Sequence, residues 1–332
     1  PFGDHLGYYS LQHEFPVMKV EKVYHRKDPL WHFTVVGRPP AEDSSFGYLI
    51  HQLVKTLTPQ EFPGIRDINA VDAAGVHPLL LAVGSERYMP FRDKKPEEIL
   101  TQANRILGSG QTSLAKFLII TAGEPDEKVS AKDIPAFFKF VLERADWRRD
   151  LHFYTKTTID TLDYSGEDWN AGSKVVMAAR GNPLRKLSTN LPGGLHLPQG
   201  FKDPTIALPG ILIVKAPAFS GTESYTEAEQ FCKIVENIDW TGIPLIVLSD
   251  DSLFAAANLN NFLWTTFTRA NPSRDIHGVQ SFFLHKHWGC KGPLVIDARI
   301  KPHHAPILQE DPAVKARVDK LFTKGGELYG LG

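Results

Sequence analysis

Two side chains of opposite charge are the first candidates for chemistry in this sequence. Asp4 lies within the opening run Pro1-Phe2-Gly3-Asp4-His5-Leu6-Gly7-Tyr8-Tyr9, and Lys116 stands directly before the apolar run 117–121. A carboxylate in a dry pocket can stay charged beside an arginine and raise the pKa of a neighbouring acid. A lysine at the end of a strand can bind a phosphate. Both residues can also be ordinary solvent-exposed side chains. Whether they form a site depends on the helices and strands that position them.

A third candidate is the segment 157–164, which contains Asp160 and Asp163. We interpret both as turn-forming residues and not as acids of a mechanism. Several other polar groups are discounted. The histidines at 285, 287, 303 and 304 lack the partner spacing of a zinc site, the loop 108–113 lacks the Gly-Lys-Ser/Thr of a phosphate loop, and no G-x-S-x-G motif is present. We therefore predict no metal ligand in this chain.

The composition is that of an ordinary globular protein. Of 332 residues, 42% are hydrophobic and 23% are charged, and 37 Lys and Arg nearly balance 38 Asp and Glu. The length allows two domains, and the balanced charge gives no field to gather nucleic acid or anionic lipid. The apolar runs 78–83 and 211–214 are far shorter than the ~20 residues that cross a bilayer. Two cysteines, Cys232 and Cys290, indicate a reducing compartment, so we expect a cytoplasmic protein without a nucleic-acid partner or a membrane span.

The amino-terminal region favours a hairpin followed by a helix. Residues 17–23 and 31–36 are rich in β-branched and aromatic residues and are joined by a turn-prone segment, which predicts two strands from a larger sheet. Residues 46–57 carry apolar side chains at helical spacing, including Phe46 and Leu49. We expect prolines 59 and 63 to end that helix.

Between residues 75 and 301, a pattern of apolar strand, amphipathic helix and apolar strand occurs twice, as in parallel sheets covered by helices. The first unit has predicted strands at 79–83, 117–121 and 172–179 and helices at 96–107 and 134–142. The second has strands at 211–215, 245–249 and 289–298 and helices at 227–238 and 259–267. Arg144 and Asp150 recur as Arg269 and Asp275, and 269 minus 144 and 275 minus 150 both give 125. The sequence therefore predicts an internal duplication.

The remaining segments connect or follow these units. Residues 182–207 are rich in Pro and Gly and indicate a linker or surface arm. In the tail, Asp311 can cap a helix that begins with Pro312. The predicted fold class is α/β: a remnant of a split β-barrel within 1–70, two repeated three-layer units at 75–181 and 208–301 with mainly parallel sheets, and a carboxy-terminal helix and tail at 302–332.

Four short motifs in one order carry a resemblance to a known family. They are the opening run 1–10, the segment Phe15-Pro16-Val17, the segment His25-Arg26-Lys27-Asp28-Pro29, and the segment Gly37-Arg38-Pro39-Pro40. Together they resemble the UbiD family of decarboxylases that use prenylated FMN. Because members normally carry several hundred residues before this point, the chain resembles a carboxy-terminal portion that lacks most of the cofactor domain.

The resemblance implies roles for particular residues. Asp4 matches the second acid of a Glu/Arg/acid network beside the flavin, while the proton-shuttling glutamate and the arginine would precede Pro1. Lys116 matches a lysine that reaches the flavin phosphate. Ile159 would shape the substrate pocket, and Phe46 and Leu49 would also face it, although core packing is the alternative for these three. The cofactors implied are prenylated FMN with a divalent metal (Mn or Mg), and potassium as a further candidate, their ligands lying outside this chain.

Two functions follow as alternatives. In the first, the chain is part of a carboxy-lyase that removes CO2 without oxidation from an aromatic or α,β-unsaturated carboxylic acid, inactive as an isolated fragment. Its partners would be that small acid, the missing amino-terminal portion and further copies in a homo-oligomer. In the second, the chain is a non-catalytic oligomerisation or assembly module, and the extra α/β unit serves that assembly. An unrelated ligand-binding α/β protein is a weaker third interpretation.

Overall fold

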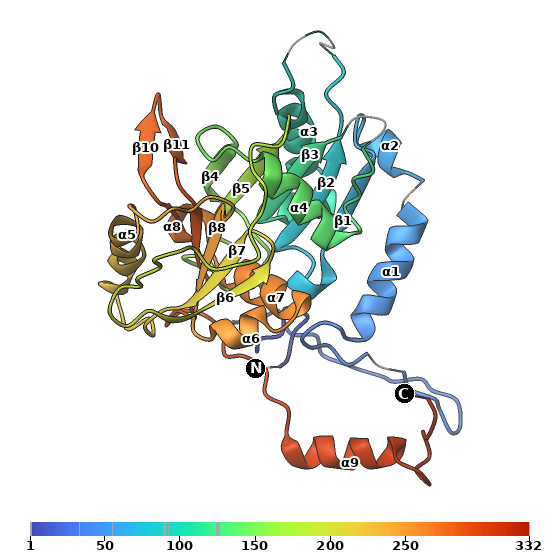
Figure 1. Ribbon diagram of the computed structural model, residues 1–332. Coiled ribbons are helices and arrows are strands. Elements are labelled where there is room, and N and C mark those ends of the chain that lie inside the picture. Colours follow the sequence, from blue (N-terminus) through green and yellow to red (C-terminus); the bar gives the residue numbers. More distant parts are fainter. Residues whose placement is uncertain are drawn as a thin grey trace.

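The computed structural model describes residues 2–32, 34–54, 56–88, 91, 93–123 and 127–331 (Figure 1). Pro1 of the opening motif lies outside the described residues, as does Phe33 of the second predicted strand. Among the described residues, no helix has both the length and the apolar composition needed to cross a bilayer. The described part contains two five-stranded sheets and a small two-stranded sheet.

The first sheet has the order β1-β2-β3-β5-β4. Its strands are β1 (Asp67–Ala70), β2 (Leu79–Gly84), β3 (Phe117–Ala122), β4 (Leu151–Thr157) and β5 (Gly172–Ala179). The central strands β2, β3 and β5 are parallel, whereas β1 and β4 pair antiparallel at the edges. Continuous apolar runs form β2 and β3, and every residue of both strands is buried, as expected for strands covered on both faces.

The second sheet repeats this arrangement strand for strand, in the order β6-β7-β8-β12-β9. It contains β6 (Lys202–Leu208), β7 (Ile211–Lys215), β8 (Leu245–Ser249), β9 (Ile276–Gly278) and β12 (Leu294–Asp297). Again the three central strands are parallel and the two edge strands antiparallel. The expectation of mainly parallel sheets therefore needs correction: both sheets are mixed. Short connections, such as residues 209–210 between β6 and β7, allow only antiparallel neighbours.

Helices cover both faces of each sheet. Helix α3 (Glu98–Leu107) packs on the outer face of the first sheet, and α5 (Ser224–Ile234) on the outer face of the second. Helices α4 (Ile134–Arg144) and α7 (Leu259–Arg269) share one hydrophobic core with the inner faces of both sheets. Phe138 on α4 contacts Phe262 and Phe267 on α7, with ring centroids 5.8 and 6.1 Å apart. The two units thus form one continuous core.

The remaining elements are short or peripheral. They are helices α1 (Glu42–Val54), α2 (Thr58–Glu61), α6 (Ser252–Ala256), α8 (Pro272–Asp275) and α9 (Pro312–Phe322), the 3-10 helices η1 (Asp72–Ala74) and η2 (Gly110–Leu114), and the hairpin β10 (Ser281–Leu284) with β11 (His287–Cys290). Helix α9 lies apart from the body (Figure 1). As predicted, Asp311 caps it and accepts a hydrogen bond from the Ala313 N–H at 2.8 Å.

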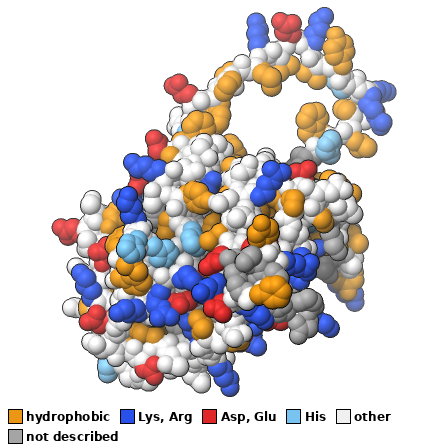
Figure 2. Space-filling view, turned by 90° about the horizontal axis from the view of Figure 1, so that it is seen from above, with side chains coloured by type: hydrophobic (Ala, Val, Ile, Leu, Met, Phe, Trp, Pro, Cys, Tyr) orange, Lys and Arg blue, Asp and Glu red, His pale blue; other side chains and the backbone are white. Residues whose placement is uncertain are grey.

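One prediction about a connecting segment is wrong, and a second differs from the structure only at its end. The predicted hairpin strands at 17–23 and 31–36 are absent from the described residues there, and the segment projects as an open loop whose hydrophobic side chains face solvent (Figure 2). Two strands alone are marginal in water, and no described strand of either sheet pairs with them. The predicted linker 182–207 is also not wholly irregular, because β6 begins at Lys202 and forms an edge of the second sheet. The many Pro and Gly residues before Lys202 indicate irregular structure, so the sequence pattern did not predict this short edge strand.

Candidate functional site

The opening motif forms a tight loop that is clamped onto helix α7. The Asp4 N–H donates to the Tyr8 carbonyl at 3.0 Å, closing the loop. The Trp264 indole N–H of α7 donates to the Leu6 carbonyl at 2.8 Å, and the Tyr8 hydroxyl is 2.8 Å from that of Thr268. The rings of Tyr8 and Trp264 stack with centroids 5.2 Å apart. A helix of the second unit therefore fixes the position of the motif.

Arg38, from the last of the four motifs, also contacts the same tryptophan. Its guanidinium lies 4.2 Å from the Trp264 ring centroid and donates to the Asn261 side-chain oxygen. Burial lowers the pKa of this guanidinium from its ordinary value, but an arginine remains charged at neutral pH. Segments at both ends of residues 1–40 thus meet on one side chain of α7.

Asp4 is buried, with 8% of its surface exposed. Its Oδ1 accepts a hydrogen bond from the His5 N–H at 2.7 Å and lies 3.0 Å from His5 Nδ1. Its Oδ2 is buried and has no hydrogen-bond partner among the described residues. Because an unpaired buried carboxylate oxygen is costly, this atom fits a partner supplied from outside the described residues.

Lys116 is also buried, with 1% of its surface exposed. Its ammonium lies 2.7 Å from Asp163 Oδ2 and donates to the Ser165 hydroxyl at 2.6 Å and to the Thr268 carbonyl at 3.4 Å. Burial lowers the pKa of this ammonium, while the charge of Asp163 acts to raise it. All three protons of the ammonium have acceptors within the protein. In this arrangement Lys116 does not fit a phosphate ligand.

The neighbourhoods of Asp4 and Lys116 nevertheless meet. One small cavity is lined by Leu6 and Tyr8 of the motif loop and by Asp163, Ser165 and Thr268, the three residues that hold the Lys116 ammonium. Neither Asp4 nor Lys116 lines the cavity itself. The predicted acid and the predicted cation therefore lie on the same side of the molecule, separated by the residues that bind each of them.

The residues predicted to form a substrate pocket are not brought together. Ile159 is fully buried, and its side chain packs closely against Gly166 and Gly172. A Cβ atom at either glycine would lie within 3.1 Å of Ile159 Cδ1. Phe46 and Leu49 are more than half exposed on α1. Ile159 is a packing residue in this structure, which is the alternative interpretation for it, whereas the two α1 side chains have no described pocket around them.

The structure assembles a cluster that sequence reasoning missed. His5, His77 and Asp160 each place one nitrogen or oxygen atom within 4.8 Å of the others. His77 Nδ1 and Asp160 Oδ2 are in direct contact, and the other Asp160 oxygen accepts from the Leu162 N–H at 2.9 Å. Since 83 residues separate His77 from Asp160, no local spacing could reveal the cluster. The only available signal was that His5 and Asp160 each fall within a recognised motif.

The cluster carries negative potential. Burial acts to lower the pKa of His5, but the hydrogen bond with Asp4 and the charges of Asp160, Asp4 and Asp43 together raise it above its ordinary value. The pKa of Asp160 is lowered despite its burial, because His77 and the Leu162 N–H stabilise its charged form. Beside the cluster lies a cavity lined by His5, Asp72, Val76 and His77 and by five residues of the segment 37–44, Asp43 among them.

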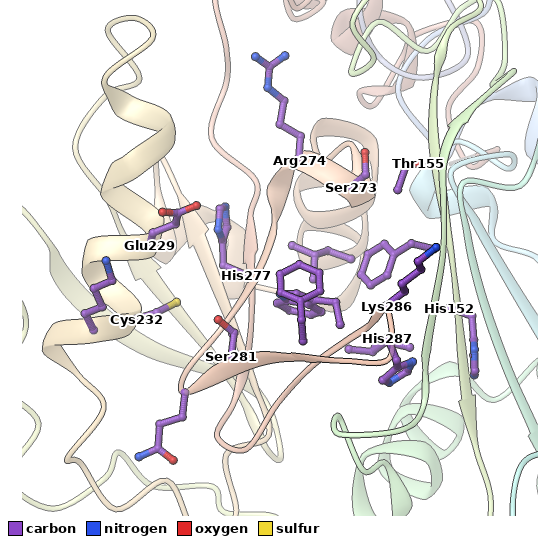
Figure 3. Close-up of a pocket in the computed structure, with 18 of the residues that line it drawn as sticks. His152, Thr155, Glu229, Cys232, Ser273, Arg274, His277, Ser281, Lys286 and His287 are labelled. Atoms are coloured by element: carbon purple, nitrogen blue, oxygen red, sulfur yellow. The ribbon is translucent and has the colours of Figure 1, made fainter.

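Another, larger cavity lies elsewhere, between β4, α5 and the β10–β11 hairpin (Figure 3). Lys233, Arg274 and Lys286 supply positive charge to its lining, opposed by Glu229 and Glu236. Burial lowers the pKa of His277 and of His152, so both imidazoles are neutral at pH 7. Neither Asp4 nor Lys116 lines this cavity. It is therefore separate from the motif loop.

Comparison with known proteins finds one family over the motif loop and the first α/β unit. Residues 1–39 match the 3-octaprenyl-4-hydroxybenzoate carboxy-lyase Rift-related domain, and residues 44–179 match the C-terminal domain of the same carboxy-lyase. These matches define the class: a relative of carboxy-lyases. The chain belongs to the UbiD family.

Individual relatives are similar over nearly the whole chain. A 4-hydroxybenzoate decarboxylase component of Chlamydia pneumoniae is 36% identical over 325 residues, which is 97% of this chain and 52% of that protein. An uncharacterized protein of Chlamydia trachomatis is 35% identical over 327 residues, also 52% of its length. The chain thus spans about half the length of these curated relatives. The similarity extends through the second α/β unit, beyond the residues that the family profiles match.

Some solved structures are similar to part of the chain. Vanillic acid decarboxylase of Sedimentibacter hydroxybenzoicus in closed form has a TM-score of 0.43 and 18% identity, covering 60% of this chain and 40% of its own. The UbiD-class enzyme HmfF of Pelotomaculum thermopropionicum, in complex with FMN, has a TM-score of 0.35 and 16% identity, covering 51% and 33%.

Proposed function

We propose that the chain is part of a UbiD-like carboxy-lyase that decarboxylates an aromatic or α,β-unsaturated carboxylic acid with prenylated FMN. The observation that carries this proposal is Asp4: a buried acid, in the family's motif, with one carboxylate oxygen left without a partner among the described residues. When bound, the flavin would supply the electron sink for loss of CO2. Family membership and the curated 4-hydroxybenzoate decarboxylase relative support the same class of reaction.

Within this reaction, the chain's own residues have defined tasks. Asp4 would hold an arginine through Oδ2, and the two together would keep the neighbouring proton-transferring acid in place. The loop 4–8 would be kept rigid by Trp264 and Tyr8, which fixes the direction of the carboxylate. We keep the phosphate role of Lys116 only as a prediction that requires its ion pair with Asp163 to open.

The remaining parts of the active site are proposed to come from an amino-terminal region such as the longer relatives contain. The divalent metal (Mn or Mg) and any potassium ion would be bound there. The domain division, the homo-oligomeric state and a cytoplasmic location also remain predictions. Both cysteine thiols are free and buried, which agrees with a reducing compartment.

The test supplies the chain with that amino-terminal region, either mixed or fused, together with prenylated FMN. Flavin retention is followed by absorbance, and CO2 release is measured with a panel of aromatic and α,β-unsaturated acids. We expect retention and turnover only with the added region. Asp4→Asn should keep the flavin but lower kcat by about 10²- to 10⁴-fold. The control Glu14→Gln, an exposed acid ten residues away, should be unaffected. Turnover by the chain alone, or full activity of Asp4→Asn, would contradict the proposal.

One observation favours the alternative, an assembly module. Helix α9 stands apart from the body and leaves the apolar side chains of Val314, Val318 and Leu321 exposed. Sedimentation of the chain alone distinguishes the two functions. A defined oligomer that Val318→Glu disrupts, combined with no flavin retention in the mixture, would favour assembly over catalysis.

A further inference from the structure

The cluster of His5, His77 and Asp160 joins three segments that are distant in sequence. His5 belongs to the motif loop, His77 stands two residues before β2, and Asp160 follows β4. Two imidazoles and one carboxylate are the donors that zinc and related divalent transition metals prefer, whereas Mg²⁺ and Ca²⁺ prefer oxygen ligands alone. These three donors alone do not define a metal site. The spacing, the neighbouring groups and the local charge must also suit a metal ion.

The spacing of the donor atoms is the first requirement. Tetrahedral zinc with bonds of about 2.0–2.1 Å places its ligand atoms roughly 3.4 Å apart. The three atoms here lie within 4.8 Å of one another, and His77 Nδ1 and Asp160 Oδ2 are in direct contact. Side-chain rotations that separate this pair and move His5 inward would bring the three atoms to that distance. The two histidine rings meet edge to face, with centroids 6.1 Å apart. Their nitrogens can therefore converge on one point without the rings colliding.

Support from neighbouring groups is the second requirement. Histidine ligands usually donate their other ring N–H to a carboxylate, which fixes the ring and its tautomer. Asp4 Oδ1 lies 3.0 Å from His5 Nδ1 and can take this part, leaving Nε2 for a metal. Asp160 is held through its second oxygen by the Leu162 N–H. Two of the three ligands are thus oriented by neighbours before any ion arrives.

Charge and access are the third requirement. Asp4, Asp43 and Asp160 place negative charge around His5, which attracts a cation. The cavity lined by His5, His77 and part of the segment 37–44 gives a path from solvent. From these observations we infer that His5, His77 and Asp160 bind one divalent transition metal ion, zinc or a similar ion, and that Asp4 positions His5 for it.

Such an ion would tie the motif loop to the first α/β unit. The loop is already attached to the second unit through Trp264, so the metal would fix it from the opposite side. Its role is positional: it sets the direction of Asp4 through His5. The inference does not rest on the proposed function, because metal retention is measured without flavin or substrate.

The experiment loads the full chain with Zn²⁺, removes loosely bound ion by dialysis and measures the zinc that remains per chain. A parallel titration with Co²⁺ reports the coordination geometry through its visible absorption bands. We expect about one Zn²⁺ per chain, a rise in the thermal midpoint, and Co²⁺ bands of a four- or five-coordinate site. Asp4→Asn should weaken binding by about 10- to 100-fold, as the loss of a ligand-orienting partner does.

The decisive variants are Asp160→Asn and His77→Ala, each expected to abolish retention and the thermal shift. Asp160→Asn keeps a side chain of the same size. If circular dichroism shows that His77→Ala does not fold, Asp160→Asn still tests the inference. The matched control is His196→Ala, a histidine outside the cluster, which should bind like the wild type. A single site predicts about one Zn²⁺ per chain. Retention of less than about one-tenth of that by the wild type, or retention by Asp160→Asn equal to that of the wild type, overturns the inference.

Discussion

The two α/β units have the same strand order and orientations but differ at the starts of their second parallel strands. In the first unit, Lys116 precedes β3 and forms a buried ion pair with Asp163. In the second, Pro244 precedes β8, and its carbonyl accepts a hydrogen bond from the Trp147 indole at 2.7 Å. The first unit therefore has a charged residue, Lys116, at this position, close to the motif loop. The second unit has Pro244 at the equivalent position, where it contacts Trp147 of the first unit.

Other equivalent positions keep their role. Asp150 accepts a hydrogen bond from the Asp146 N–H at 2.8 Å, and Asp275 accepts one from the Asn271 N–H at 2.7 Å. The cation beside each differs: Arg149 for Asp150, and Lys301 for Asp275. The comparison teaches that positions which close the local turn are held in both units, while positions that face the motif loop or the partner unit have diverged.

The largest effect is expected in the hydrophobic core that the two units share. Phe137 on α4 and Phe262 on α7 are fully buried equivalents. Phe137→Ala and Phe262→Ala should each lower the free energy of unfolding by about 3–5 kcal/mol. Because one core joins both sheets, urea unfolding should remain a single transition. The exposed Phe283→Ala should change stability by less than about 0.5 kcal/mol. Two separate transitions would show that the units unfold independently.

The buried acids give a smaller effect that depends on pH. Burial raises the pKa of Asp275 from 3.8 to about 6, against the opposing charge of Lys301. The folded state then holds a proton more tightly than the unfolded state, so this contribution to stability is present below pH 4 and is lost as the pH rises through 6. The loss is at most about 3 kcal/mol.

We therefore expect Asp275→Asn to gain stability relative to the wild type between pH 4 and pH 7, measured by urea unfolding at each pH. Burial also raises the pKa of Asp150, despite Arg149, so Asp150→Asn should change in the same direction. A difference from the wild type that does not vary with pH would contradict the assignment.

The smallest effect concerns the helix caps. Asp133 caps α4 by accepting from the Ala136 N–H at 3.2 Å, and Asn258 caps α7 by accepting from the Asn261 N–H at 2.9 Å. Asp133→Ala and Asn258→Ala should each destabilise by about 1 kcal/mol. Hydrogen exchange should quicken at the first-turn amides of the helix concerned. The corresponding glycine variants should lose only a few tenths of a kcal/mol; equal losses for Ala and Gly would argue against a capping role.

Most of the α/β body was predictable from the sequence. Strands β7 and β8 have the predicted bounds, and helices α4 and α7 begin at the predicted residues, because long apolar runs and helical periodicity report burial directly. The edge strands β1, β4, β6 and β9 were not predicted. They are short and only partly apolar, and their pairing depends on neighbours that are distant in sequence.

The site was less predictable than the body. The motif located Asp4 and the strand pattern located Lys116, yet neither pattern showed that Asp163 would neutralise Lys116 or that His77 would meet Asp160. These contacts join residues from different elements, and their chemistry depends on tertiary distance. The exposed apolar residues at 17–36 also led to a wrong prediction, because β-branched composition predicts a strand only where a sheet is present to receive it.

The clamp of Trp264 on the motif loop has a consequence for anyone who wishes to shorten or recombine this protein. A version truncated after residue 181 would retain Asp4 but lose the indole that grips Leu6, the hydroxyl beside Tyr8 and the carbonyl that receives Lys116. The later half of the chain is thus a scaffold on which the earliest residues depend, and chimaeras with other members of the UbiD family would need to carry both parts together.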